Sequence, residues 1–170
     1  RTTELRSVKS RMLYQMPASP AMPPDANGQG PLGVTYTFGV QAAEIRIEKK
    51  SGKILVDKFT SVFDVGQVIN SLQIRGSVLG GVNMAIGAAL AEELVFDKDG
   101  KITNPQFFQY RIPTYKDSPE QVIEFLETPD PIGPFGARGI GEHSVVGAAP
   151  AILNAVYDAT GVDLYDIPLT

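Results

Sequence analysis

The residues best suited to chemistry in this chain form one short segment, Gly136-Ala-Arg-Gly-Ile-Gly-Glu142. It ends directly before an alanine-rich apolar stretch whose spacing predicts a helix from about Ser144 to Ala159, with Gly161 as its stop. The carboxylate of Glu142 is therefore expected near the positive end of a helix dipole and beside unpaired backbone N–H groups. Because glycine has no side chain, the backbone of the segment lets a bulky ligand approach closely.

Three interpretations of this glycine loop compete. A dinucleotide-binding loop needs a third glycine and a strand directly before it, but Ser144 takes the third position and a proline-rich stretch, 129–134, precedes the loop. A Walker-type phosphate loop fails as well, since no Gly-Lys-Ser/Thr ending is present. The other two interpretations are a structural turn whose acid stabilises the helix, and a general base delivered into a cofactor cleft. The local pattern does not choose between these two.

Composition limits the chemistry that the chain can carry by itself. Its 170 residues include one histidine, His143, and no cysteine, so it has no disulfide, no zinc–thiolate site and no iron–sulfur cluster of its own. A single histidine cannot form a histidine-based metal site alone. The formal net charge of −4 argues against a nucleic-acid surface, and no apolar run approaches the ~20 residues that cross a bilayer. The first residues carry no secretory signal, and we expect a cytoplasmic protein.

A β-hairpin and two helices are the elements that must position the loop. Alternating apolar residues predict one strand from Val34 to Glu48 and a second from Ile54 to Val62, joined by a turn at 50–53. A change of phase near Ala42-Ala43 predicts a bulge. This hairpin is expected to be scaffold.

A segment rich in glycine and alanine, Leu72–Leu90, is predicted to be a buried helix with Asn70 as its N-cap and with Asp64 capping the region before it. In a helix each glycine costs roughly 1 kcal/mol relative to alanine. Close packing against another backbone or a flat ligand is expected to offset that cost at Gly76, Gly80, Gly81 and Gly87.

The remaining segments predict further short strands. One pair, 92–96 and 101–103, flanks a turn at 98–100, and another strand runs from Val122 to Leu126. Strands and two long helices are mixed without a repeating βαβ rhythm, so the predicted fold class is α+β.

Several segments, in order, resemble the xanthine dehydrogenase / aldehyde oxidoreductase family of molybdenum hydroxylases. The glycine loop with its alanine-rich helix is one of them, and the strand Tyr36–Glu44 is similar to the first strand of the family's domain. The other three are Phe63-Asp-Val-Gly-Gln-Val-Ile-Asn70, Gln73-Ile-Arg-Gly-Ser77 with its helix as far as Ala91-Glu-Glu-Leu94, and Tyr110-Arg-Ile-Pro113. The resemblance spans nearly all of the chain from residue 34 onward.

The resemblance implies the C-terminal part of a molybdopterin-binding large subunit. It predicts an α+β fold of mixed hairpins and sheet with two long helices, forming half of a molybdenum-cofactor-binding domain over residues 34–170. Residues 1–33 are expected to be a linker or opening segment. The chain begins at Arg1 and lacks the family's earlier cofactor segments, so we expect a piece of a longer protein. The implied activity is the hydroxylation of aldehydes or N-heterocycles.

Matching positions with the family assigns the site residues. Glu142 matches the family's general base beside the molybdenum, Gln73 matches the glutamine that contacts the pterin, and the backbone of Gly139, Ile140 and Gly141 matches a segment that lies against the cofactor. The helix glycines at 76, 80 and 81 are then expected near that ligand. His143 is either a substrate-side residue or a solvated residue of the first helical turn. Arg138 is expected to form an ordinary surface or loop ion pair.

The implied cofactor is the molybdenum cofactor, with molybdopterin alone or as a dinucleotide, whereas iron–sulfur clusters and FAD belong to partner domains or subunits. The implied partners are the missing half of the molybdopterin-binding subunit, an iron–sulfur subunit, a flavoprotein subunit in some assemblies, and a small-molecule substrate. Neither nucleic acid nor a membrane is expected as a partner. The alternative is a non-catalytic homologue or assembly module that keeps the fold without molybdenum.

Overall fold

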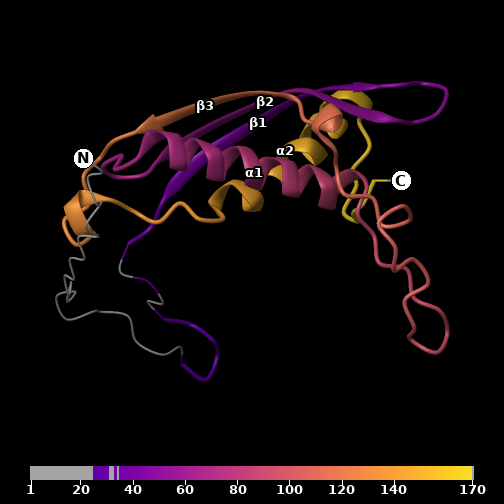
Figure 1. Ribbon diagram of the computed structural model, residues 1–170, viewed down its shortest axis with the longest axis horizontal. Helices are drawn as coiled ribbons and strands as arrows, with labels where there is room; N and C mark the ends of the chain where they lie inside the picture. Colours follow the sequence, from indigo (N-terminus) through magenta and orange to yellow (C-terminus); the bar gives the residue numbers. More distant parts are fainter. Residues whose placement is uncertain (1–24, 31–32, 34, 170) are drawn as a thin grey trace, which may run out of the picture.

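The computed structural model describes residues 25–30, 33 and 35–169, which form a three-stranded sheet with two helices packed on one of its faces (Figure 1). The predicted opening segment, 1–33, lies mostly outside these residues. In chain order the elements are β1 (Phe38–Ile47), β2 (Ile54–Asp64), α1 (Ser71–Leu90), the 3-10 helix η1 (Tyr115–Asp117), β3 (Glu120–Leu126), the 3-10 helix η2 (Pro134–Gly136) and α2 (His143–Thr160).

The predicted hairpin is confirmed, since β1 and β2 pair antiparallel from Phe38 opposite Asp64 to Ile47 opposite Ile54. The predicted bulge is present, but it lies between Glu44 and Ile45, two residues beyond its expected place. The extra residue is on β2, where Asp57 accepts two hydrogen bonds from the guanidinium of Arg46, at 2.6 and 2.7 Å. This exposed ion pair thus stabilises the irregular part of the ladder.

The strand predicted at 122–126 is confirmed as β3, which pairs parallel with β2 and makes the sheet mixed, in the order β1-β2-β3. A parallel neighbour requires a crossover connection. Helix α1 provides this crossover, so the chain contains one βαβ unit, which the sequence analysis did not predict. The α+β fold class is confirmed.

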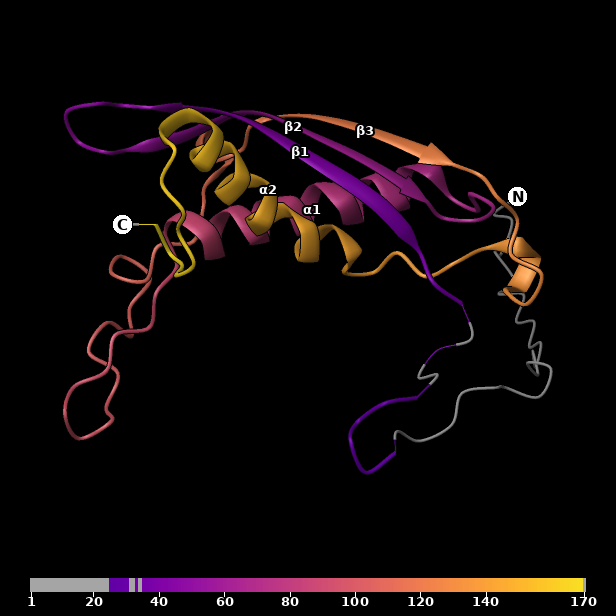
Figure 2. The same ribbon diagram turned by 180° about the vertical axis from the view of Figure 1, so that it is seen from behind.

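Both helices cover the same face of the sheet, as the view from behind also shows (Figure 2). Helix α1 begins as predicted, because the Asn70 side chain accepts a hydrogen bond from the Gln73 N–H at 3.0 Å. Within the described residues, neither helix is long and apolar enough to cross a membrane. The core between sheet and helices consists mainly of Phe59, Phe63, Val65, Ile123, Val78, Val82, Ala85, Ile86, Ala148 and Ile152.

Three expectations need correction. Asp64 does not cap a helix, since its carboxylate accepts hydrogen bonds from Gly66 and Thr128 in the loops that follow β2 and β3. Helix α1 is buried on one side only, and Leu72 on its other side is 83% exposed.

The hairpin predicted at 92–103 is reduced to a single bridge between Phe96 and Ile102, in a segment that projects from the body (Figure 1). A two-stranded hairpin is marginal unless a further strand or helix packs against it, and neither view shows a helix or strand beside this segment. The turn itself forms as predicted, because the Asp97 carboxylate accepts hydrogen bonds from the N–H groups of Asp99 and Lys101.

Candidate functional site

The glycine loop, residues 136–142, is bonded to the turn that follows β2. Gly66 and Ala137 form an isolated antiparallel bridge, and the Arg138 N–H donates to the Val65 carbonyl at 2.8 Å. The carbonyl of Gly136 accepts from the Gln67 N–H at 2.8 Å. Two segments about 70 residues apart in the chain are thereby joined, and the first half of the loop is fixed to the end of the sheet.

The loop is entered through a tight turn. Phe135 and Gly136 both have positive φ, at 54° and 77°, and Phe135 is the one non-glycine residue among those described with this conformation. Gly66 also has positive φ, at 65°, and a Cβ on it would overlap the Gly136 carbonyl. Glycine is therefore required at 66 for both its conformation and its close approach.

The second half of the loop faces open space. Gly139 and Gly141 are exposed, and a Cβ built on Gly141 would meet no described atom within 4 Å. At Gly139 the nearest described atom would be in the His143 ring, at 3.9 Å. Ile140 between them is partly buried and packs against the core. The backbone here is thus held by the Ile140 side chain and by the Thr37 hydroxyl, which donates to the Gly139 carbonyl, and is otherwise open at both glycines.

Glu142 occupies the N-cap position of α2, but its side chain makes no capping hydrogen bond. Its carbonyl accepts from the Val145 N–H at 3.0 Å, as the start of the helix requires. Among the residues that the structure describes, its exposed carboxylate has no hydrogen-bond or ion-pair partner. An unpartnered acid therefore stands at the N-terminus of an 18-residue helix.

The first turn of α2 is pinned from two directions. Ser144 is fully buried, and its side chain lies so close to Gly81 of α1 that a Cβ there would overlap it. From β1, the Gln41 amide donates to the Ser144 carbonyl at 3.1 Å and to the Ser61 hydroxyl at 3.2 Å. Glu142, two residues before Ser144, therefore lies at a helix end whose backbone is well fixed.

For the glycines of α1, the expected close packing against another element is confirmed at Gly81 and the expected burial is wrong at Gly76 and Gly80. Gly81 serves the contact between the two helices, because its neighbours are Ser144 and Val145 of α2. Gly76 and Gly80 were predicted to be buried, but both are exposed, and a Cβ on either would meet nothing within 4 Å among the described residues.

Gln73 lies exposed in the first turn of α1. No described residue forms a hydrogen bond with its side-chain amide, whereas its N–H is used in the helix cap. It precedes Gly81 by eight residues, about 12 Å along the helix axis. Among the described residues no hydrogen bond joins Gln73 to the glycine loop, so both are open polar positions.

Arg138 was expected to form an ordinary surface or loop ion pair; it does form ion pairs in the loop, but its side chain is only 12% exposed. One of its terminal nitrogens, Nη1, lies 3.6 Å from Oδ2 of Asp64 and donates to the Tyr36 carbonyl at 3.1 Å. Its Nε lies 3.4 Å from Oδ2 of Asp130. The sequence analysis missed this cluster. Its available signal was the pair Asp64-x-Gly66 and Asp130-x-Ile132, in which a carboxylate can bond to N–H groups of a following turn.

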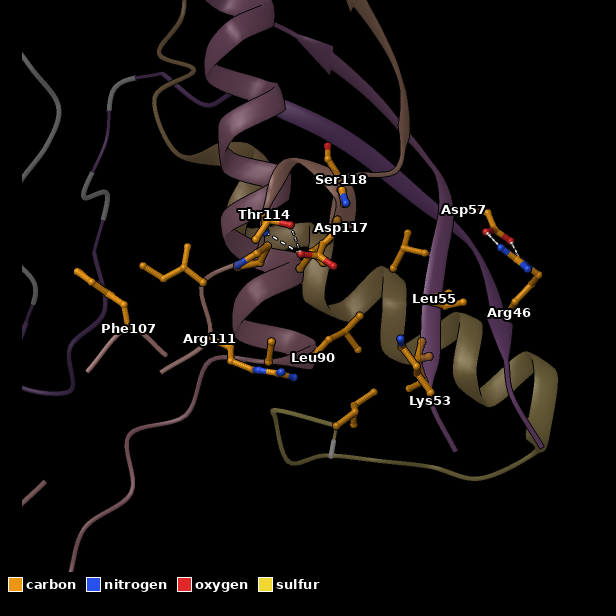
Figure 3. A pocket seen from close by; sticks show the side chains of 18 of the residues that line it. Arg46, Lys53, Leu55, Asp57, Leu90, Phe107, Arg111, Thr114, Asp117 and Ser118 are labelled. Atoms are coloured by element: carbon orange, nitrogen blue, oxygen red, sulfur yellow. Dashed lines mark hydrogen bonds and ion pairs between the residues drawn. The ribbon is translucent and has the colours of Figure 1, made fainter. Parts of the chain in front are cut away.

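A cavity of about 890 Å³ lies elsewhere, between the turn end of the hairpin, the last turns of α1 and residues 107–118 (Figure 3). None of the five predicted site residues lines it. Its charged groups include Lys53, Arg111 and Asp117 (Figure 3). The hydroxyl and N–H of Thr114 bond to Asp117 and, with these two cations, hold the pKa of its carboxyl below the usual value. Asp117 therefore acts as a local structural anchor of η1.

Comparisons with known proteins agree on one relationship. The family model described as the molybdopterin cofactor-binding domain matches residues 4–119. The chain is 38% identical over 136 residues to the aldehyde oxidoreductase molybdenum-binding subunit PaoC of Escherichia coli. The alignment covers 79% of this chain and 19% of PaoC. It is 36% identical over 138 residues to the nicotine 6-hydroxylase large subunit of Paenarthrobacter nicotinovorans, covering 79% of this chain and 17% of the relative.

A solved structure gives the same result. The aldehyde oxidoreductase of Desulfovibrio gigas matches with a TM-score of 0.81 and 35% identity, over 89% of this chain and 16% of that one. The chain thus spans less than a fifth of the length of each of these three proteins.

Proposed function

Since this chain belongs to the molybdopterin cofactor-binding domain family of xanthine dehydrogenase and aldehyde oxidoreductase large subunits, we propose that its residues 34–170 are the C-terminal cofactor-binding portion of a molybdenum hydroxylase. The substrates in this proposal are aldehydes or N-heterocycles, and Glu142 is the general base. One observation carries the proposal. The only acid of the glycine loop is an exposed carboxylate that no described side chain or backbone group engages.

The residues present fit the implied cofactor. A large pterin needs open backbone and unused polar groups, and the chain offers both in the exposed backbone at Gly139 and Gly141 and in the free amide of Gln73. The first N–H groups of α2 also lack acceptors within the helix, as at every helix N-terminus. In the proposal, Gln73 and the backbone from 139 to 141 hold the cofactor, which supplies the redox and oxygen-transfer chemistry when bound.

The chain's own part in the reaction is proton transfer and orientation. A carboxylate oxygen of Glu142 accepts a proton in the oxidation step, a role that contributes typically 10²–10⁴-fold, or about 3–5 kcal/mol of barrier. The turn after β2 and the buried start of α2 fix the backbone on either side of Glu142, from which the exposed carboxylate projects. Such fixed placement is itself a large part of catalysis.

Partners follow from the short length of the chain. The rest of the large subunit supplies the remaining cofactor contacts and the substrate pocket. An iron–sulfur subunit, with a flavoprotein subunit in some assemblies, accepts the electrons, because this cysteine-free chain has no ligands for a cluster. The relatives are themselves named as subunits. We propose a cytoplasmic complex of this kind, with the pterin as molybdopterin or its dinucleotide.

The test of the base is Glu142→Gln in the assembled enzyme. The amide keeps the size of the side chain but cannot accept the proton, so kcat is expected to fall by about 10²–10⁴-fold. Molybdenum content should stay at the wild-type level. Glu124→Gln, on the exposed face of β3, is the matched control and should leave kcat unchanged. Wild-type turnover in the Glu142 variant would refute the assignment.

The same preparations test the role of Gln73. Gln73→Ala removes the proposed pterin contact, so the purified enzyme is expected to contain less molybdenum and pterin per subunit. Gln109→Ala, at another exposed position, should keep the full content. Undiminished cofactor content in the Gln73 variant would remove that residue from the site. A complex free of both molybdenum and iron, from molybdate-fed cells, would instead identify a non-catalytic homologue or assembly module.

A further inference from the structure

We propose that Arg138 is a positioning residue, which holds the segment from Gly139 to Glu142 in place through ion pairs with Asp64 and Asp130. The inference rests on the proposed role of Glu142 as the base. Arg138 lies four residues before that acid, in the half of the loop that is bonded to the sheet.

The geometry places Arg138 between three separate segments. Asp64 ends β2, Asp130 lies in the loop after β3, and Tyr36 precedes β1. The distances are 3.6 Å from Nη1 to the Asp64 carboxylate, 3.4 Å from Nε to the Asp130 carboxylate and 3.1 Å from Nη1 to the Tyr36 carbonyl. A single guanidinium thus ties together the three segments that surround the start of the loop.

Both carboxylates are themselves held by backbone. Oδ1 of Asp130 accepts from the N–H groups of Ile132 and Gly133, at 2.9 and 2.8 Å. Oδ1 of Asp64 accepts from Gly66 and Thr128, at 3.2 and 3.1 Å. In each case the other oxygen, Oδ2, is the one nearest Arg138. The arginine therefore lies between two anchored anions at ion-pair distance, while its one side-chain hydrogen bond with a described residue goes to the Tyr36 carbonyl and its Nε makes none.

Between Arg138 and the fixed first turn of α2 the loop has few other restraints. The Thr37 hydroxyl donates to the Gly139 carbonyl at 2.5 Å, and Ile140 packs on the core, but both glycines are open to space. Arg138 is the last residue with a buried charged anchor before Glu142. A displacement of about 1 Å at a catalytic group can cost ~100-fold in rate, so loss of this anchor should act on the chemical step.

The test uses the complete enzyme with Arg138→Met, which removes the charge and keeps the apolar stem. We expect kcat to fall by about 100-fold while KM stays within about twofold and molybdenum content stays at the wild-type level. Amide hydrogen exchange, read on peptides covering 136–142, should become faster. Arg46→Met is the matched control, since it breaks the exposed pair with Asp57 and should change none of these values.

Two further variants keep the test decisive. Arg138→Lys retains the charge and should recover part of the kcat lost in the Met variant. If the Met variant does not assemble, Asp130→Asn carries the same expectation, with a lower kcat, an unchanged KM and faster exchange in 136–142. Wild-type kcat and exchange in every variant that assembles would overturn the inference. A higher KM with an unchanged kcat would overturn it as well.

A double variant separates this inference from the proposed function. If Arg138 acts through Glu142, Arg138→Met should add little to the loss already present in Glu142→Gln. A full further loss in that background would show that Arg138 acts elsewhere and would overturn the inference. Wild-type turnover of Glu142→Gln alone would instead refute the proposed base, while the exchange measurement would still report whether Arg138 holds the loop.

Discussion

At the scale of single residues, Asp64 connects the loops that follow β2 and β3 with Arg138 of the glycine loop. Burial alone would raise the pKa of its carboxyl, but hydrogen bonds from Gly66 and Thr128, together with the charge of Arg138, lower the pKa below its usual 3.8. The ionised form is thus favoured in the folded state. Its stabilising effect is fully present above the ordinary carboxyl pKa and is lost as the pH falls through the lowered pKa of the folded state.

A pH series tests this linkage. Asp64→Asn cannot ionise, so the variant should unfold at a lower temperature near neutral pH than the wild-type subunit. Between about pH 5 and about pH 3 its melting temperature should fall less steeply, because one of the carboxylates that protonate on unfolding is missing. Asp163→Asn, at an exposed position near the C-terminus, is the control. Parallel curves for Asp64→Asn and wild type would contradict the linkage.

Residue-level features were predictable where they are local. The Asn70 cap, the Gly161 stop and the place of Glu142 at the start of a helix depend on neighbours within a few positions, and the structure has all three. The burial of Arg138 was not predictable in this way. Its partners come from residues 36, 64 and 130, and only the tertiary fold brings those segments together.

At the scale of elements, the two neighbouring glycines at 80 and 81 of α1 have opposite environments. Gly80 points to open space, whereas Gly81 lies against Ser144 and Val145 of α2. A helical glycine costs roughly 1 kcal/mol relative to alanine, so only the second position has an evident structural reason for it within this chain. The close contact at Gly81 sets how near the start of α2 lies to α1.

Alanine at each position makes a matched pair of variants. Gly81→Ala inserts a methyl group into the helix contact and should destabilise the subunit by about 1–3 kcal/mol. Gly80→Ala gains helix propensity and should leave stability unchanged or raise it by up to about 1 kcal/mol. Chemical unfolding of the purified subunit measures both. A loss of stability at Gly80 would show that a part of the subunit outside this chain approaches that face closely.

Regular elements were predictable from periodicity, and their partners were not. Both helices and all three strands of the sheet lie close to their predicted ranges. The parallel pairing of β3 with β2 depends on the crossover through α1, which a strand pattern alone does not reveal. The hairpin predicted at 92–103 had a strand-like pattern, but no helix or strand packs against it and only one bridge forms.

At the scale of the whole molecule, the sheet is covered on one face only (Figures 1 and 2). On the other face, the exposed side chains of Phe38 and Val40 from β1 share a surface with Leu126 of β3, since the register puts Asp64 opposite both Phe38 and Leu126. Contiguous exposed apolar residues mark interaction surfaces. The chain covers only 19% of the length of its relative PaoC, and an uncovered apolar face is what such a piece of a larger subunit is expected to show.

The isolated chain is therefore expected to self-associate. Light scattering on a size-exclusion column should give a mass above that of one chain. Val40→Lys puts a charge in the middle of the open sheet face and should shift the distribution toward the monomer. Lys58→Arg, which changes no charge on the same face, is the control. A stable monomer of the unmodified chain would show that this surface needs no cover.

Because β2 and β3 are parallel, the candidate site and the hairpin turn lie at opposite ends of the sheet. Both strands end at the same edge of the sheet, and the segments that lead to Gln73 and to Glu142 start from that edge. The turn of the hairpin and the projecting segment 91–114 lie at the opposite end (Figure 1). Insertions at that far end would leave the loop that carries Glu142 untouched. The hairpin turn and the turn at Asp99-Gly100 can thus vary without direct contact with the loop that carries Glu142.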